Sequence, residues 1–347
     1  MDKINYIKNS QDIKKIKIPS ERTIYSATHE EIKVGLTADV YFLRTHEMLT
    51  SLGLDRTKVT AEIFATRGGT LAGTKEALNL LRNLEVSVWS LREGDEFTKK
   101  EVVMRIEGPY GEFGLYETAL LGMLASSSGW ATAARECKET AQGCQVICFG
   151  ARHLHPAVAP VMERAAIIGG ADGCSCILGA KLLGKEPIGT VPHAAFLIVG
   201  DTVKVARTFD EIMPEEVPRI ILVDTFKDEA EETLRVASAL TEKLEGVRLD
   251  TPGERGGVTP GLVKEVRARL DLEGFKHVKI LASGGITPQR MPELIEAGVD
   301  AFGVGSYISR APAIDMTMDL KEIESKALAK RGRIPGKTDN YRLKKVI

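Results

Sequence analysis

The sequence predicts an α/β protein with two parts: an irregular, incomplete (β/α) barrel of about seven strands, and an N-terminal α/β sandwich domain completed by the C-terminal tail. After Gly143, short apolar runs alternate with helical segments, which is typical of a parallel sheet buried on both faces. Before that point, strand and helix patterns are mixed. We therefore expect domains at residues 1–115 and 116–310, with residues 311–347 returning to the N-terminal domain.

The composition is that of a soluble globular protein. The chain has 347 residues, 43% hydrophobic and 27% charged, and a formal net charge of −1. This charge gives no basic surface for nucleic acid, and no apolar run is long enough to span a membrane. The polar start is not a signal peptide, and the five cysteines form no C-x-x-C pair. We expect a cytoplasmic protein with reduced thiols, no cysteine-bound metal, and no nucleic-acid or membrane partner.

The N-terminal part carries both periodicities. Helical spacing is found at Glu30–Leu36 and Asp39–Arg44, and half-buried strands are predicted at Val59–Thr66, Ser87–Leu91 and Val102–Glu107. The stretch Gly68–Lys75 is close to a nucleotide-binding P-loop, but Thr74 separates its second glycine from the lysine. We interpret it as a turn before a helix at Thr74–Leu84.

The later part repeats one unit, a short apolar strand followed by a helix. The expected strands are Gln145–Phe149, Gly173–Leu178, Ile188–Val191, Ile220–Asp224, Val247–Asp250, Val278–Ser283 and Ala301–Val304. The clearest helices are Ala159–Ile168, Glu229–Leu244 and Leu262–Leu270. No G-x-G-x-x-G follows a first strand, so a dinucleotide-binding sheet is disfavoured. Beyond the barrel, Met316–Ile323 has the pattern of a further strand.

The last two barrel strands both run into glycines. Glycine lets the backbone approach an anion closely, and barrels commonly bind phosphate after their last strands. Two ordinary strand-to-helix turns are the alternative. The predicted phosphate cradle consists of Ser283, Gly284, Gly285, Gly303, Gly305 and Ser306.

Other candidate residues, one aromatic and the rest polar, lie at the ends of the remaining strands, where barrel enzymes place their chemistry. They are Phe149, Arg152, His153, Thr190, His193, Asp224, Arg248 and Asp250. An aromatic ring beside arginine and histidine suits a flat ring next to a polyanion. The two aspartates could bind sugar hydroxyls or hydrated Mg²⁺, although helix capping would also explain them. The set suits a phosphorylated sugar that carries a second anionic group.

Taken in order, these motifs resemble the nicotinate phosphoribosyltransferases, particularly their shorter archaeal and bacterial branch. The matching stretches are Thr37–Thr45, Phe149–Pro156, Gly169–Gly173, Gly189–His193, Leu222–Phe226, Val247–Asp250, Ser283–Ile286 and Lys330–Gly336. They span almost the whole chain, and their joint occurrence is far more specific than any one of them. The resemblance implies a sandwich domain joined to an irregular barrel, and a homo-oligomer, at least a dimer, with a shared active site.

The resemblance also implies a reaction: nicotinate and 5-phosphoribosyl 1-pyrophosphate (PRPP) give nicotinate mononucleotide and pyrophosphate, with ATP and Mg²⁺ taking part. Phe149 would stack on the pyridine ring, and Tyr41 of a neighbouring subunit would cover its other face. Arg152 and Arg248 would hold the pyrophosphate, with His153 and Thr190 beside the substrate.

The remaining implied roles concern the sugar and ATP. Asp224 and Asp250 would lie near the ribose hydroxyls and Mg²⁺, and the glycine cradle would take the 5-phosphate. His193 would be phosphorylated by ATP and so couple ATP hydrolysis to transfer. Asp172 would face the amide if nicotinamide were the acceptor.

Three alternatives remain open. The decarboxylating quinolinate phosphoribosyltransferases share the fold, but they need extra cations for a second carboxylate. Their Thr-Arg-Lys-Thr run is replaced here by Ala151-Arg152-His153-Leu154. A phosphate-binding aldolase or isomerase would need a lysine at a strand end, whereas Lys279 opens its strand. The third alternative is a binding protein without catalysis.

Overall fold

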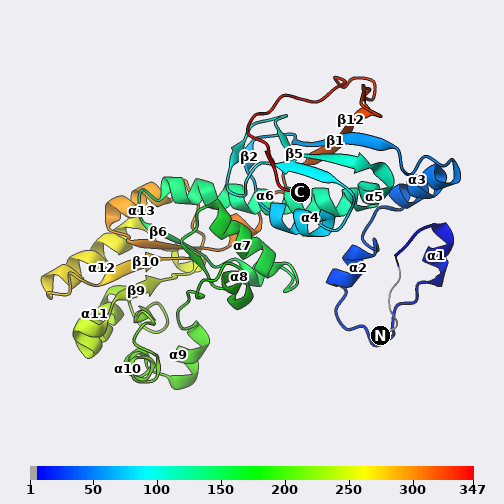
Figure 1. Ribbon diagram of the computed structural model, residues 1–347. Coiled ribbons are helices and arrows are strands. Elements are labelled where there is room, and N and C mark those ends of the chain that lie inside the picture. Colours follow the sequence, from blue (N-terminus) through cyan, green and yellow to red (C-terminus); the bar gives the residue numbers. More distant parts are fainter. Residues whose placement is uncertain (1–5) are drawn as a thin grey trace. The chain divides into compact units, whose positions relative to one another are not determined.

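The computed structural model describes residues 6–347, and the chain divides into two compact units. The first consists of Met1–Gly129 and Pro312–Ile347, and the second of Trp130–Ala311. Each unit contains one six-stranded sheet (Figure 1). The division falls inside helix α6 (Glu117–Thr140). No helix within the described residues is long and apolar enough to cross a membrane.

The sheet of the first unit is antiparallel and takes half of its strands from the C-terminal segment. Its order is β13-β12-β1-β5-β3-β14. The strands are β1 (Lys58–Ala65), β3 (Ser87–Ser90), β5 (Val102–Pro109), β12 (Met316–Ile323), β13 (Lys326–Ala327) and β14 (Lys344–Lys345). Strands β12, β13 and β14 of the C-terminal segment thus lie in the sheet of the first unit. A separate two-stranded ribbon joins β2 (Gly69–Thr70) and β4 (Glu96–Phe97).

One face of this sheet is apolar because alternate residues of β1 point to the same side. Ala61 and Ile63 are completely buried there, against Leu81 of α4 and Leu120 of α6. The helices of this unit are α1 (Ser10–Lys15), α2 (His29–Lys33), α3 (Val40–Ser51), α4 (Thr74–Leu81), α5 (Tyr110–Phe113), the 3-10 turn η1 (Gly114–Tyr116) and the first half of α6.

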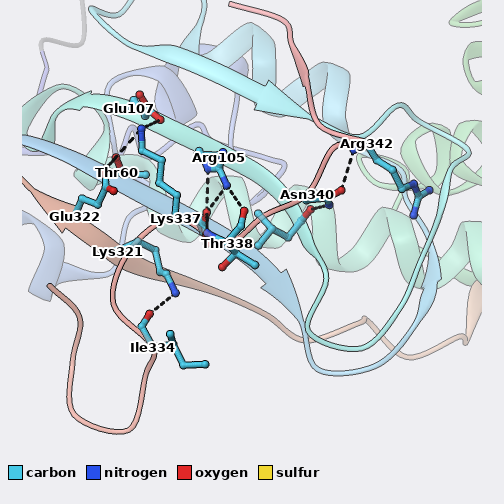
Figure 2. A network of polar contacts seen from close by, with 12 residues as sticks. Thr60, Arg105, Glu107, Lys321, Glu322, Ile334, Lys337, Thr338, Asn340 and Arg342 are labelled. Carbon is cyan, nitrogen blue, oxygen red and sulfur yellow. Dashed lines mark hydrogen bonds and ion pairs between the residues drawn. The ribbon is translucent and has the colours of Figure 1, made fainter. Parts of the chain in front are cut away.

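The C-terminal segment makes polar contacts with the other residues of these strands (Figure 2). Glu62 on β1 is only 1% exposed, and its Oε1 has several hydrogen-bond donors. It accepts hydrogen bonds from Arg105 Nε at 2.9 Å and NH2 at 2.6 Å, and from the Thr338 backbone N–H at 3.0 Å. Lys337 pairs with Glu107 at 2.8 Å. Buried charges that are paired in this way fix the path of the tail across the sheet.

Removal of one partner tests this arrangement. We expect Arg105→Met to lower the free energy of unfolding by about 3–5 kcal/mol, because Glu62 would stay buried without its cation. Urea unfolding followed by circular dichroism measures the change. Lys326→Met on the exposed strand β13 is the matched control and should cost less than about 0.5 kcal/mol. Equal losses in the two variants would show that the buried pair contributes nothing.

The sheet of the second unit is parallel and open, in the order β7-β6-β11-β10-β9-β8. Its strands are β6 (Gln145–Cys148), β7 (Gly173–Cys174), β8 (Ile220–Leu222), β9 (Gly246–Leu249), β10 (Lys279–Ala282) and β11 (Ala301–Val304). Helices follow most strands: α7 (Ala159–Gly169), α8 (Ile177–Lys181), α9 (His193–Val199), α10 (Thr202–Ile212), α11 (Glu229–Leu240), α12 (Pro260–Leu272), α13 (Met291–Ala297) and α14 (Ser306–Ser309). The 3-10 turns are η2 (Ala151–His153), η3 (Thr241–Lys243) and η4 (Gly253–Arg255).

This unit therefore has six strands in the described part of the chain, not about seven in a barrel. The strand predicted at Ile188–Val191 is absent as a strand, although the Ile188 N–H donates to Cys174 O at 2.8 Å. Pro187 precedes it and has no N–H to continue a ladder. The strand predicted at Gly173–Leu178 ends at Cys174, because α8 already begins at Ile177.

The helix boundaries follow local rules. Asp228 caps α11 by accepting the N–H groups of Ala230 and Glu231. Buried Val236 and Leu240 of α11 lie four residues apart on one side of the helix. Pro260 occupies the first turn of α12, where its missing N–H costs nothing.

Candidate active site

The strand register brings the predicted polar residues to one face of the parallel sheet. Leu222 of β8 pairs with Arg248 of β9, which pairs with Leu281 of β10, which pairs with Ala301 of β11. Paired residues point to the same face, and so do the residues two positions further on. These residues at the carboxyl ends are Asp224, Asp250, Ser283 and Gly303. Sequence-distant groups therefore meet because the strands are in this register.

Arg248 connects this group. Its Nε donates to Ser283 Oγ at 2.8 Å, and its NH1 donates to Thr190 Oγ1 at 3.0 Å. Its NH2 lies 3.2 Å from Asp250 Oδ2, and Ser283 Oγ in turn donates to Asp250 Oδ1 at 2.7 Å. The guanidinium carbon lies 5.2 Å from the centre of the Phe149 ring. The arginine is thus held in one orientation, over an aromatic surface.

Phe149 needs the glycine at position 303. A Cβ added to Gly303 would lie 2.6 Å from two carbons of the Phe149 ring and 3.1 Å from Ser283 Cβ. The ring packs against the buried cluster of Ile147, Leu281 and Ala301. Because Gly303 of β11 has no side chain, the Phe149 ring has the space in which it lies.

This contact gives a prediction. Gly303→Ala should displace the Phe149 ring, because a carbon at 2.6 Å cannot be tolerated without movement. We expect the KM for the ring substrate to rise about 10-fold, with a smaller change in kcat. Steady-state kinetics at saturating sugar phosphate measure both. Gly189→Ala, where a Cβ would meet nothing within 4 Å, is the control. An unchanged KM in Gly303→Ala would show that Phe149 does not stack on the ring substrate.

His193 and Asp224 form a second pair. His193 Nε2 lies 2.9 Å from Asp224 Oδ2, and the aspartate side chain is 1% exposed. Asp224 Oδ1 is buried and has no hydrogen-bond partner among the described residues. Burial raises the pKa of Asp224, and the hydrogen bond from His193 opposes that shift. An unpartnered carboxylate oxygen of this kind is suited to a hydroxyl or a cation.

Arg152 and His153 lie on the η2 turn after β6, and both are exposed. The pKa of His153 is lowered, first by partial burial and then by the positive charges of Arg152 and Arg310. Arg310 follows α14 and was not among the predicted residues. Three cationic or ionisable side chains from two segments therefore share one neighbourhood, which is a setting for an anion.

The first glycine turn has the backbone that glycine allows. Gly284 and Gly285 have φ values of 82° and 65°, and both are exposed. Arg290 supports the turn from outside, donating from NH1 to Gly285 O at 2.9 Å and from NH2 to Val258 O. The second turn lies beside η2, because a Cβ on Gly305 would be 3.1 Å from His153 Nε2. Ser306 begins α14 directly after it.

Two carboxylates of this group could share a metal ion with a bound substrate. Within residues 6–347 no group of three or more His, Cys, Asp or Glu could hold a metal ion by itself. Asp224, with its free Oδ1, and Asp250 nevertheless fit a Mg²⁺ ion that is also bound by substrate oxygens. Such an ion would be held by two carboxylates and the sugar phosphate.

Within the second unit, Asp172 is not brought into this group. Asp172 precedes β7, so it lies at the amino end of the sheet, where its carboxylate binds Lys138 Nζ at 2.8 Å and accepts the Val146 N–H at 2.8 Å. Its expected contact with an amide is therefore not supported. Tyr41 lies on α3 of the first unit and is 55% exposed. Its contact with a neighbouring subunit stays a prediction.

Sequence reasoning missed three residues, namely Glu163, Arg290 and Arg310. Arg290 and Arg310 follow the glycine turns at short distance, so a search for cations near those turns would have found them. Glu163 lies in the middle of helix α7 beside Arg164, and a pair of opposite charges on a helix gives no sign that one of them is buried.

The fold and the polar groups at its strand ends define a two-domain α/β protein with a candidate active site at the carboxyl ends of a parallel sheet. The family model described as the N-terminal domain of quinolinate phosphoribosyl transferase matches residues 39–128, and the C-terminal domain model of that name matches residues 130–319. The chain therefore belongs to the quinolinate phosphoribosyltransferase family.

Individual relatives carry two kinds of name, nicotinate-nucleotide pyrophosphorylase and nicotinate phosphoribosyltransferase. A crystal structure of nicotinate-nucleotide pyrophosphorylase from Pyrococcus furiosus is 47% identical, with a TM-score of 0.87, over 91% of this chain and 82% of that one. A probable carboxylating nicotinate-nucleotide pyrophosphorylase of Methanothermobacter thermautotrophicus is 24% identical over 84% of this chain and 99% of its own length. A nicotinate phosphoribosyltransferase of Mycobacterium tuberculosis is 31% identical over 74% of this chain. The chain spans only 56% of that last protein.

The expectation of an ATP-coupled nicotinate phosphoribosyltransferase is therefore wrong, and with it nicotinate and ATP as substrates and a phosphohistidine at His193. Both domain models and the 47% identical structure overturn it. The quinolinate phosphoribosyltransferases are one of the alternatives that the sequence leaves open, although their Thr-Arg-Lys-Thr run is missing here. The structure places Arg310 near His153 and Arg152 instead, so cations from separate segments supply positive charge that one local motif does not.

Proposed function

We propose that this protein transfers the phosphoribosyl group of PRPP to quinolinate. The ring nitrogen of quinolinate forms a bond to the anomeric carbon, and the bond to pyrophosphate breaks. The 2-carboxyl group leaves as CO₂, and a proton takes its place on the ring, which gives nicotinate mononucleotide. The observation that carries the proposal is the match of both domains to one family, 39–128 and 130–319.

The cations around Phe149 support a doubly charged ring substrate. Arg248 lies over the Phe149 ring. Burial and then the positive charges of Arg152 and Arg310 lower the pKa of His153. A pyridine dicarboxylate would stack on Phe149 and meet guanidinium groups on more than one side. Arg152 and Arg248 would also face the departing pyrophosphate, where fixed positive charge stabilises the developing anion.

The sugar would be held by the neighbouring groups. The turns Ser283–Gly285 and Gly303–Ser306 would take the 5-phosphate, because glycine permits close backbone approach. Asp224 and Asp250 would accept hydrogen bonds from the ribose hydroxyls, and their negative charge would favour the positive charge that builds on the ribose. Mg²⁺, when bound, would neutralise part of the pyrophosphate charge.

A direct assay tests the proposal. The purified protein is mixed with Mg²⁺, PRPP and quinolinate labelled in its 2-carboxyl group, and both labelled CO₂ and nicotinate mononucleotide are measured. We expect equal amounts of the two products, with no dependence on ATP. Parallel mixtures contain nicotinate or nicotinamide in place of quinolinate. Transfer to either of these, with no release of CO₂ from quinolinate, would refute the proposal.

A further inference from the structure

Glu163 of helix α7 is a buried carboxylate at the carboxyl ends of two neighbouring strands. Its side chain is completely buried. Its Oε1 accepts hydrogen bonds from the Ala151 N–H at 3.0 Å and from Ser175 Oγ at 3.1 Å. Its Oε2 accepts the Cys176 N–H. One carboxylate thus satisfies three donors that come from two loops.

These donors belong to the loops that leave adjacent strands. Ala151 opens the η2 turn after β6, and that turn carries Arg152 and His153. Ser175 and Cys176 connect β7 to α8. The two strands pair directly, with Cys148 opposite Cys174. Glu163 therefore holds together the loops that follow two paired strands. One of its hydrogen-bond donors, Ala151, directly precedes Arg152.

Burial of the Glu163 carboxylate costs free energy, and hydrogen bonds from neighbouring groups offset that cost. A buried carboxylate is tolerated when several hydrogen bonds compensate its lost hydration, and three do so here. Burial raises the pKa of Cys174 to about 12, and the negative charge of Glu163 adds to the shift. An apolar residue could fill this space, but it could not hold both loops.

We propose that Glu163 is a positioning residue, which fixes the η2 turn so that Arg152 and His153 meet the pyrophosphate and the ring carboxylates. The catalytic part of this inference rests on the proposed function. Arg152 is exposed, so the direction of its side chain depends on its own backbone. Loosening a turn by about 1 Å can cost about 10²-fold in rate when the turn carries a group that must be aligned.

The variant Glu163→Gln isolates this role. The amide keeps the size and one acceptor oxygen, but its NH₂ group would face the Cys176 N–H, donor against donor. We expect about 10-fold weaker binding of pyrophosphate by calorimetry, and kcat/KM for PRPP lower by about 30-fold. Amide hydrogen exchange should become faster in residues 149–156 and 174–178. All measurements are made well below the melting temperature, where the variant is folded.

The control is Asp300→Asn, an identical chemical change at the opposite ends of the strands. Asp300 accepts the Ile280 N–H at 2.8 Å, at the amino end of β10. This variant should keep the affinity for pyrophosphate and the slow exchange of residues 149–156. If Glu163→Gln does not fold, Ser175→Ala removes one donor of the three and should weaken pyrophosphate binding about 2- to 5-fold.

The two proposals can fail separately. If the wild-type protein does not convert quinolinate, the proposed function fails, while hydrogen exchange and pyrophosphate binding still test the role of Glu163. The positioning role is overturned if Glu163→Gln binds pyrophosphate as the wild type does with unchanged exchange in both loops. It is equally overturned if Glu163→Gln does not fold and Ser175→Ala binds pyrophosphate with wild-type affinity.

Discussion

Replacing Arg248 with lysine is expected to lower kcat/KM by about 10³-fold, although the positive charge is kept. The guanidinium contacts Ser283, Thr190 and Asp250 through three different nitrogens. A lysine has one ammonium group on a flexible stem and cannot reach all three in this planar arrangement. It would also lose the stacking over Phe149. The loss should therefore exceed that from charge alone.

Steady-state kinetics with quinolinate and PRPP measure this loss. Arg267→Lys is the matched control, because Arg267 also uses several nitrogens, to Val278 O, Phe275 O and Asp271. Those contacts lie at the amino end of β10, away from the strand ends that carry Asp250 and Ser283. The control should lose stability and keep its kcat/KM. If Arg248→Lys stays within about threefold of wild type, the central role of this arginine is wrong.

Much of the parallel sheet could be predicted because its strands are short apolar runs that end in polar residues. The run ending at Asp224 became β8, and the run ending at Ser283 became β10. The failures have a local cause. One strand is expected at Gly173–Leu178, but β7 ends at Cys174, and Cys176 is already the N-cap residue of α8. Periodicity alone does not show where hydrogen bonding between strands stops.

Predicting the site depended on knowing which end of a strand each residue occupies. Asp224 and Asp250 follow their strands, so their meeting could be expected from a parallel sheet. Asp172 precedes β7, as Asp300 precedes β11, and each carboxylate accepts the N–H of a residue at the start of the neighbouring strand. A position before a strand therefore predicts a structural cap. Glu163 could not be predicted in this way, because its three hydrogen-bond donors come together only in the folded chain.

The identity of the substrate was the hardest part to predict. The stretch expected to hold the cations for a second carboxylate, Ala151-Arg152-His153-Leu154, contains no lysine. In the fold, Arg310 is close enough to influence His153, although many strands and helices separate them in sequence. Charge gathered from separate segments leaves no local pattern.

The second large effect is expected from Asp224→Asn, which should separate activity from stability. We expect kcat to fall by about 10²-fold or more, since the amide cannot supply the negative charge beside the ribose. Stability at pH 7 should be equal to that of the wild type or higher. Burial raises the pKa of Asp224, and its Oδ1 has no partner within the described residues, so the ionised carboxylate costs folding free energy. The uncharged amide removes that cost and can keep a hydrogen bond with His193.

The pH dependence of stability shows whether the ionised Asp224 carboxylate stabilises or destabilises the folded protein. A carboxyl group whose pKa is raised on folding binds its proton more tightly in the folded state. Its cost is absent below the unfolded-state pKa of about 4, grows as the pH rises towards the folded-state pKa, and is constant above that. The stability of Asp224→Asn relative to wild type should therefore improve from pH 4 to pH 7, as measured by urea unfolding.

Asp201→Asn provides the opposite case. Hydrogen bonding from the Lys204 N–H and the Arg235 side chain lowers the pKa of Asp201, the N-cap of α10. That carboxylate stabilises the fold above its unfolded-state pKa, so the variant should become less stable relative to wild type over the same pH range. If both variants follow the same trend, burial does not dominate at Asp224. In that case the unpartnered oxygen is compensated in solution, and the carboxylate is kept for activity at no cost to the fold.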